Sequence, residues 1–372
     1  MMRMVKRSCA IGLMLILAVA SAAAAQREVD ETKPARRDGR VEINNVKGSV
    51  HVVGWDRNEV RVEGKLGRGV ERLDFESNHR RTMVRVVYPR EGWLRRSDPS
   101  HLTVHVPVGS AVVVDAVSAD VSAEEILGLL DLESVSGDVK VSKAGSEVRA
   151  HTTSGDVGIE IVFGPLEAES VSGDIRIRGA ASDVRARTVS GDIEMDHVPS
   201  ESELVGGDTP PRGAEVDAVS VSGDILVAGA LLREVECESV SGSIRIDGSF
   251  VPDGEVRLNS HSGDVRVRAD SLRRVTGESM SGDVRFEAEK LAPDASIRLE
   301  AYSGSISMTV PRDLAGRVDL STFSGRISTE VEGQLMGYER AAPGKRVSGT
   351  IGSGDAKIWA KTLSGSITVR TR

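Results

Sequence analysis

The dipeptide Ser-Gly, in most copies followed by Asp and then Val or Ile, recurs along most of this 372-residue chain. The glycines of the first four copies are each 18 residues apart, and later copies follow at wider, less regular intervals. A repeat of about 20 residues is typical of a solenoid, in which each repeat forms one coil that rests on its neighbours. The chain is therefore predicted to grow by stacking, although its length alone would suggest two or three domains. The motif glycines are Gly137, Gly155, Gly173, Gly191, Gly223, Gly242, Gly263, Gly282, Gly304, Gly325, Gly354 and Gly365.

Apolar and polar residues alternate on both sides of each motif glycine. The residue seven positions before it is aliphatic, as in Val148, Leu166 and Val184, and the residues two and four positions after it are mostly β-branched. Alternation of this kind predicts short β-strands with one buried face. Each repeat has room for two strands and two corners. The sequence thus predicts an all-β fold, a single-stranded parallel β-solenoid (β-helix) with about 18–22 residues per coil and coils ~4.8 Å apart.

The motif itself is expected to form one corner of each coil. Glycine lacks a Cβ and can adopt a positive φ there, while the neighbouring Asp can accept hydrogen bonds from backbone groups. The expected turn ladder consists of Gly137, Asp138, Gly155, Asp156, Gly173, Asp174, Gly191, Asp192, Gly223, Asp224, Gly263, Asp264, Gly282 and Asp283.

Beside this corner, either of two columns of equivalent residues could face the interior of the solenoid. The residue three positions before the glycine is Ser or Thr in many copies, and the residue two before it is mostly apolar. Simple alternation would bury the hydroxyl column and expose the apolar one, whereas a bulge at the corner would reverse this. We expect the bulge, because a long exposed apolar stripe would favour aggregation.

The rest of the chain divides around the repeats. Residues 1–25 are predicted to be a secretory signal peptide, since Arg3, Lys6 and Arg7 precede an apolar run that ends in small residues. Residues 26–39 are expected to form a flexible leader, 40–115 an irregular β segment that starts the solenoid, and 116–372 the repeat solenoid, with loops near 199–213 and 332–346. We expect an exported chain, periplasmic or extracellular. No later stretch has the ~20 apolar residues of a transmembrane helix.

Several segments, together with the series of Ser-Gly-Asp corners, resemble the bacterial putative adhesin family, a group of exported solenoid proteins built on a domain of unknown function. The resemblance covers essentially the whole mature chain. It implies an exported β-solenoid and no catalytic residue, because that family defines none. The matching segments are Val41-Glu42-Ile43, Gly48-Ser49-Val50, Gly54-Trp55-Asp56 and Leu102-Thr103-Val104-His105-Val106-Pro107.

The row of corner aspartates is the strongest candidate for a metal site. Carboxylates ~4.8 Å apart repel by roughly 0.9 kcal/mol per pair even in bulk water, so the row needs a positive neighbour. Ca²⁺ would suit such oxygen ligands. A basic column two residues further on, however, can neutralise the row without an ion. That column contains Lys140, Arg176, Arg266 and Arg285. We therefore expect Asp to cap the corners, with no bound metal and no cofactor.

The remaining reactive side chains have simpler interpretations. Cys237 falls in an inward column and is expected to be a buried structural thiol. His101 and His105 would share one face of a strand but lie ~13 Å apart, too far for one metal ion.

The similarity of the coils to one another disfavours a catalytic site. A polysaccharide-active β-helix would need one distinct acid–base set, usually beside aromatic platforms. Here aromatic residues are 3% of the chain, and its three tryptophans are scattered. The sequence predicts instead a non-enzymatic, cell-envelope binding or adhesin-like scaffold that acts through its repetitive surface. The alternatives are a structural polymer that assembles end to end, since the last coil from Gly365 to Arg372 lacks an obvious polar cap, and, less favoured, a polysaccharide-active enzyme.

The expected partner is an unknown envelope component, protein or polysaccharide. Loss of the signal peptide would lower the formal net charge from −8 to −11, because it removes three basic residues. The net charge is negative, and the chain lacks an interleaving of aromatic with basic residues, so nucleic acid is disfavoured as a partner. A local basic segment forms a candidate patch for an anionic ligand, and its residues are Arg80, Arg81, Arg95 and Arg96.

Overall fold

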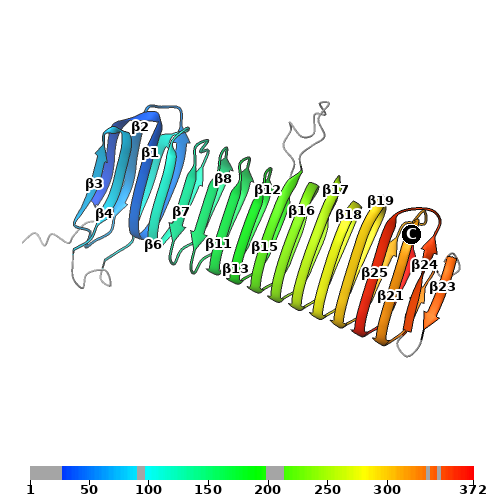
Figure 1. Ribbon diagram of the computed structural model, residues 1–372. Coiled ribbons are helices and arrows are strands. Elements are labelled where there is room, and N and C mark those ends of the chain that lie inside the picture. Colours follow the sequence, from blue (N-terminus) through cyan, green and yellow to red (C-terminus); the bar gives the residue numbers. More distant parts are fainter. Residues whose placement is uncertain (1–26, 90–96, 198–212, 332–335, 342–344) are drawn as a thin grey trace, which may run out of the picture.

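The computed structural model describes residues 27–89, 97–197, 213–331, 336–341 and 345–372, and these form one long β-solenoid (Figure 1). The described residues make 26 strands and no helix, so they offer no helix able to span a membrane. The parallel β-solenoid predicted from the repeat is confirmed. The predicted signal peptide, residues 1–25, lies outside the described residues.

Each central coil contributes one strand to each of two facing sheets. Equivalent residues of successive coils pair in parallel at the predicted spacing of 18, as in Leu166 with Val184 and Val157 with Ile175. The first sheet contains β7 (Leu130–Ser134), β9 (Val148–Thr152), β11 (Leu166–Ser172), β13 (Val184–Ser190) and β15 (Ala214–Ser222). The second contains β8 (Val139–Ala144), β10 (Val157–Val162), β12 (Ile175–Ala180) and β14 (Ile193–His197).

Later coils continue both sheets without a break at the second corner. Their strands are β16 (Ile225–Ser241), β17 (Ile244–Ser262), β18 (Val265–Ser281) and β19 (Val284–Ser303). The core lies between the two sheets and consists of the aliphatic columns seen in the sequence, with Val148, Leu166 and Val184 all buried. The period-two alternation thus places the β-branched side chains in one continuous interior.

The N-terminal end combines parallel and antiparallel pairing. Its strands are β1 (Arg27–Trp55), β2 (Glu59–Leu66), β3 (Arg72–Ser77), β4 (His79–Val87), β5 (Ser100–Pro107) and β6 (Ala111–Glu124). Residues 40–53 of β1 pair with β6 on one side and with β4 and β5 on the other. The first coil in the sequence is therefore covered by later strands.

The prediction of a flexible leader at 26–39 is wrong from Arg27 onward. Residues 27–34 pair antiparallel with β2 as part of β1. Val29 and Ala35 are buried, so the segment has apolar side chains that hold it to the solenoid. Residue 26 itself lies outside the described residues.

At the C-terminal end, the order of coils in space differs from their order in the sequence. The strands there are β20 (Ile306–Val310), β21 (Gly316–Ser324), β22 (Ile327–Thr329), β23 (Met336–Ala341), β24 (Lys345–Ile351), β25 (Ala356–Ser364) and β26 (Ile367–Thr371). Strand β25 pairs with both β19 and β21, and β26 pairs with both β20 and β22. The last coil of the sequence is thus inserted between two earlier coils (Figure 1).

Two expectations about this end of the chain need correction. The last coil does not form the end of the stack, because β24 pairs antiparallel with β21 beyond it and β23 pairs antiparallel with β24. The missing polar cap on that coil therefore gives no reason to expect end-to-end assembly. The loop expected near 332–346 contains β23 and the first residues of β24 within its described part. The loop expected near 199–213 lies, except for Gly213, outside the described residues.

Candidate binding surfaces

The motif glycines bring successive coils into very close contact. A Cβ on Gly173 would lie 1.9 Å from the carbonyl oxygen of Gly155, and one on Gly191 would lie 2.1 Å from that of Gly173. No side chain fits at such distances. Among the corner glycines only Gly263 has a positive φ, so the freedom of glycine to adopt a positive φ does not explain its presence at the other corners. Glycine is needed because the backbones approach one another.

One predicted copy of the motif lies elsewhere. A Cβ on Gly354 would meet the carbonyl oxygen of Ala315 at 2.3 Å, whereas Gly365 follows Gly304 in the ladder and Gly325 follows Gly365. Ser353-Gly354-Asp355 is therefore not a corner of the ladder. The sequence around this copy also differs, because Ala356 stands where the ladder copies have Val or Ile, and Ile351 stands where most of them have Ser or Thr.

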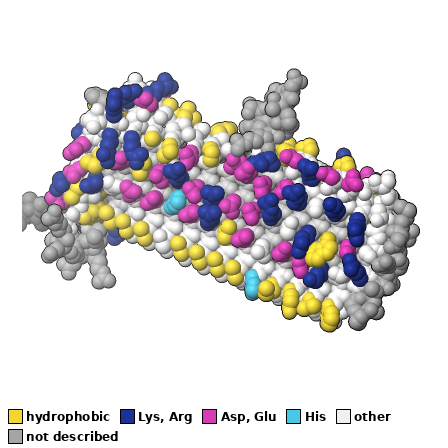
Figure 2. Space-filling model, in the orientation of Figure 1, with side chains coloured by type: hydrophobic (Ala, Val, Ile, Leu, Met, Phe, Trp, Pro, Cys, Tyr) yellow, Lys and Arg dark blue, Asp and Glu magenta, His cyan; other side chains and the backbone are white. Residues whose placement is uncertain are grey.

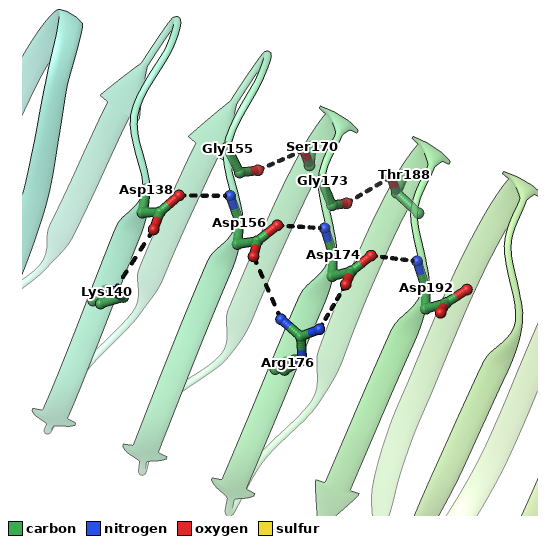
Figure 3. A network of polar contacts seen from close by, with 10 residues as sticks. All are labelled: Asp138, Lys140, Gly155, Asp156, Ser170, Gly173, Asp174, Arg176, Thr188 and Asp192. Carbon is green, nitrogen blue, oxygen red and sulfur yellow. Dashed lines mark hydrogen bonds and ion pairs between the residues drawn. The ribbon is translucent and has the colours of Figure 1, made fainter.

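The aspartates of the predicted ladder come together as a chain of backbone caps (Figure 3). The Oδ1 atom of Asp156 accepts a hydrogen bond from the backbone N–H of Asp174 at 2.9 Å, and Asp174 does the same for Asp192 at 3.0 Å. The chain continues through Asp224, which accepts from the backbone N–H of Ser243 at 2.7 Å. Each carboxylate thus satisfies a donor of the next coil.

Basic side chains stand beside this row of carboxylates. Arg176 bridges Asp174 at 2.6 Å and Asp156 at 3.5 Å, and Lys140 lies 3.7 Å from Asp138. Further along, Arg285 bridges Asp264 and Asp283, each at 2.9 Å. The fourth predicted neutralising residue, Arg266, pairs with Glu287 instead. Among the described residues there is no group of three or more His, Cys, Asp or Glu side chains arranged to hold a metal ion.

The Ser/Thr column lies inside the corner, contrary to the expected bulge. Ser170 donates its hydroxyl hydrogen to the carbonyl oxygen of Gly155 at 3.1 Å, and Thr188 donates to that of Gly173 at 3.2 Å (Figure 3). The same bond joins Ser260 to Gly242. The half-buried glycine carbonyl needs a donor, and a hydroxyl supplies one where an apolar side chain could not. This requirement outweighs the cost of exposing the neighbouring apolar residue.

The neighbouring column consequently forms an exposed apolar ridge along one edge of the solenoid, visible as an almost straight yellow row in Figure 2. Val171 is 46% exposed, Tyr302 60% and Phe323 74%. In spatial order the apolar ridge consists of Val117, Val135, Thr153, Val171, Val189, Val221, Val240, His261, Met280, Tyr302, Leu363 and Phe323.

The outer face of the second sheet carries two open hollows, each bordered by acidic, basic and apolar side chains. The first, of about 410 Å³, opens beside Gly158, whose missing side chain leaves a gap between Lys140 and Arg176. The second, of about 450 Å³, lies beside Leu226 and is bordered by Arg245 and other polar side chains. Residues 140, 158, 176, 194, 226 and 245 occupy equivalent positions in consecutive coils, so both hollows lie on one line along the solenoid.

The outer face of the first sheet carries a hollow of about 540 Å³ bordered by seven acidic and only two basic side chains. Its charges pair from coil to coil, as those of the aspartate row do. Arg149 lies 3.8 Å from Glu167, and Arg187 lies 3.8 Å from Glu169 and 3.0 Å from Asp217. These partly exposed ion pairs satisfy much of the charge on this face. The ladder aspartates border the two hollows of the second sheet, whereas the apolar ridge lies apart from those hollows.

The structure describes only two of the four arginines in the predicted anionic-ligand patch. Arg81 pairs with Glu42, and this contact holds the pKa of the Glu42 carboxyl below its usual range. Arg80 lies next to it on β4. Arg95 and Arg96 lie outside the described residues.

The predicted thiol and histidines occupy structural positions. Cys237 is fully buried, and burial, with smaller contributions from Asp217 and Glu236, raises the pKa of its thiol. His101 pairs with the Ser49 hydroxyl, whereas His105 stacks on a tryptophan ring and contacts Glu63. The two histidines thus have different partners.

The sequence matches a known family along nearly its whole length. The family model Toastrack DUF4097 matches residues 23–228 and 178–370. Two solved structures are similar over 93% of this chain: a putative cell adhesion protein from Clostridium sporogenes, 7% identical, fully covered and with a TM-score of 0.16, and a putative adhesin from Bacteroides fragilis, 10% identical, 98% covered and with a TM-score of 0.21. No curated protein matches the chain.

Proposed function

The chain belongs to the Toastrack DUF4097 family, and from this premise we propose that it is a non-enzymatic, exported scaffold of the cell envelope that binds an elongated polysaccharide along the second sheet. The single observation that carries the proposal is the alignment, on one outer face, of two hollows that are each bordered by both acidic and basic side chains. They extend over ten coils, from His51 to Arg285, or ~43 Å at the usual strand spacing.

The side chains around the hollows fit a polymer rich in hydroxyl groups. Lys140 and Arg176 supply donors at the first hollow, and Glu160 supplies an acceptor. Arg245 and Glu194 offer the same pair at the second. A repeating ligand would contact both hollows at once, and many weak contacts on a rigid frame add up to useful affinity.

The same geometry supports a binding role over a catalytic one. The carboxylates nearest the first hollow, Asp138 and Asp156, each accept a backbone hydrogen bond from the following coil. Asp156 also pairs with Arg176. Carboxylates committed to the corners in this way serve the coil contacts, and the same arrangement recurs from coil to coil. A hydrolase would instead need one acid–base pair set apart from the rest.

Co-sedimentation with insoluble polysaccharide from the native envelope tests the proposal. The purified mature chain should sediment with the polymer, and Gly158→Arg should weaken binding at least tenfold because its side chain fills the first hollow. Gly158→Ala should bind normally, since its Cβ meets only the Lys140 side chain, at 3.6 Å. Thr276→Arg, which adds the same charge to the other sheet, is the matched control.

Two results would contradict the proposal. One is a wild-type chain that stays in the supernatant, or a Gly158→Arg variant that binds as tightly as the wild type. The other is release of soluble sugar fragments during the incubation, which would favour the enzyme alternative.

A further inference from the structure

The apolar ridge is unusual for a surface that faces only water. It contains ten hydrophobic side chains in twelve consecutive coils, each at least 37% exposed. Contiguous exposed apolar surface of this kind marks an interaction site in soluble proteins. The row of serines beside it, which includes Ser172 and Ser190, is exposed and uncharged as well. Burying these two columns against a partner would require no desolvation of charge.

We propose that the partner is a second copy of this chain, which packs antiparallel along the same ridge. Two copies of one solenoid share the same coil spacing of ~4.8 Å. Their side chains can therefore interdigitate in register along the whole row. An unrelated globular partner would match this repeat only locally. The straight course of the ridge in Figure 2 allows two rods to lie side by side.

The distribution of side-chain size along the ridge selects the antiparallel arrangement. The half nearer the N-terminal end carries mainly valines, whereas the other half carries Met280, Tyr302 and Phe323. A two-fold axis between Val221 and Val240 places small residues opposite large ones over the full length. Val171 then faces Met280 of the second copy, and Thr153 faces Tyr302. A parallel pair would crowd the large residues at one end and leave a gap at the other.

The available area is sufficient for a weak dimer. Twelve coils span ~53 Å, and the strip from the charged column on one side to the serine column on the other is ~10 Å wide. Each copy thus offers about 500 Å², and the pair about 1,000 Å², which is near the lower limit for a specific contact. We expect a dimer that dissociates in the micromolar range.

One flank of the ridge carries charges of both signs. In the antiparallel pair this flank faces its own copy, so that Glu169 faces Glu278 and Glu133 faces Lys361. Repulsion at one contact is offset by attraction at another, and both are screened by salt. The dimer should therefore depend only weakly on ionic strength, unlike an association driven by charge attraction.

Cysteine crosslinking of the purified mature chain tests the arrangement, since its native thiol, Cys237, is buried. Val221→Cys lies beside the proposed axis and should crosslink to itself with a short bis-maleimide. Val117→Cys should not, because its two copies would lie ~53 Å apart. The double variant Val117→Cys/Phe323→Cys should crosslink again. Self-crosslinking of Val117→Cys alone would indicate a parallel pair and overturn the proposal.

Light scattering over a concentration series supplies the second measurement. The wild type should show a dimer that changes little with added salt, and Val221→Glu should weaken it at least tenfold with an unchanged melting curve. Leu127→Glu, at an exposed apolar residue outside the ridge, should leave it intact. A wild-type monomer at 100 µM would overturn the proposal and leave the ridge to another partner. If Val221→Glu fails to fold, the crosslinking pattern alone decides.

This inference is independent of the polysaccharide proposal, because the hollows and the ridge lie on different parts of the coil. Val221→Glu should leave polysaccharide binding by a single chain unchanged, and Gly158→Arg should leave the dimer unchanged. Failure of one proposal is thus distinguishable from failure of the other.

Discussion

The central coils and the C-terminal end use the same corner contacts but connect them differently along the chain. In the centre, Thr188 bonds the carbonyl of Gly173, 15 residues earlier. At the C-terminal end, Thr362 bonds Gly304 across 58 residues, and Thr322 bonds Gly365 across 43 residues in the reverse order. A corner therefore accepts any coil with the matching Gly and Ser/Thr, whatever its place in the sequence. The geometry of a coil thus depends on its contacts with the adjacent coils, whereas the order of the coils in space depends on the fold of the whole chain.

The largest expected effect comes from removing the inserted coil. Truncation of residues 353–372 should destabilise the C-terminal end by more than about 5 kcal/mol, because it removes five buried apolar side chains and opens a gap between β19 and β21. Those side chains are Ala356, Ile358, Ala360, Ile367 and Val369. Circular dichroism melting and limited proteolysis should show early loss of this end.

A deletion in the centre is the matched control. Removing residues 155–172 joins Ser154 to Gly173 in the same register, since the deleted length is one repeat of 18. The shortened solenoid should fold and melt cooperatively near the wild-type temperature. If it unfolds as readily as the C-terminal truncation, coils are not interchangeable in the way the corner contacts suggest.

The next largest effect is expected at a corner glycine. Gly173→Ala should cost about 3 kcal/mol, because the new methyl group would overlap the Gly155 carbonyl and force two coils apart. Gly325→Ala has an equally short contact, 1.8 Å from the Gly365 carbonyl oxygen, but lies near the end of the stack, where the coils can shift. It should cost less. Chemical denaturation would measure both.

Gly158→Ala separates this steric effect from a general effect of losing glycine. Gly158 points outward from a strand with open space around it, so alanine should leave stability unchanged or raise it by up to about 1 kcal/mol. Equal losses for Gly158→Ala and Gly173→Ala would contradict the steric explanation.

A smaller effect is expected from the buried hydroxyls. Thr188→Val keeps the shape of the side chain but leaves the Gly173 carbonyl without its donor, which should cost about 1–2 kcal/mol. Thr362→Val should cost a similar amount at the C-terminal end, because the local contact is the same. Ser190→Ala, at an exposed serine, should have almost no effect on the denaturation midpoint. A neutral Thr188→Val would mean that another group satisfies the carbonyl.

Much of this architecture follows from the sequence alone. The period-two alternation of residues such as Val148 and Leu166 predicts the strands, and the spacing of 18 predicts their register, because both depend on neighbours one coil away. The row of corner aspartates and the basic column beside it were visible for the same reason. Those patterns are repeated, so each copy supports the next.

The incorrect predictions concern features about which the repeats carry no information, or positions at which two physical effects oppose each other. The aggregation risk of an exposed apolar stripe favours an outward position for the column with Ser170, whereas the need of the Gly155 carbonyl for a donor places Ser170 inside. The persistence of Ser or Thr in that column was the available signal. The insertion of the last coil has no such signal, because Gly365 stands in the same kind of motif as Gly304 and Gly325, the two glycines between which it lies.

The smallest expected effect concerns the carboxylate row, and it sharpens the contrast between a cap and an ion pair. Asp174→Asn keeps an oxygen that can accept from the Asp192 N–H and loses the charge that pairs with Arg176. Since that ion pair is partly exposed, the variant should lose at most about 0.5 kcal/mol. Asp174→Ala also removes the cap and should lose about 1 kcal/mol. Equal losses in urea denaturation would mean that charge, and not the backbone cap, explains why aspartate stands at this corner.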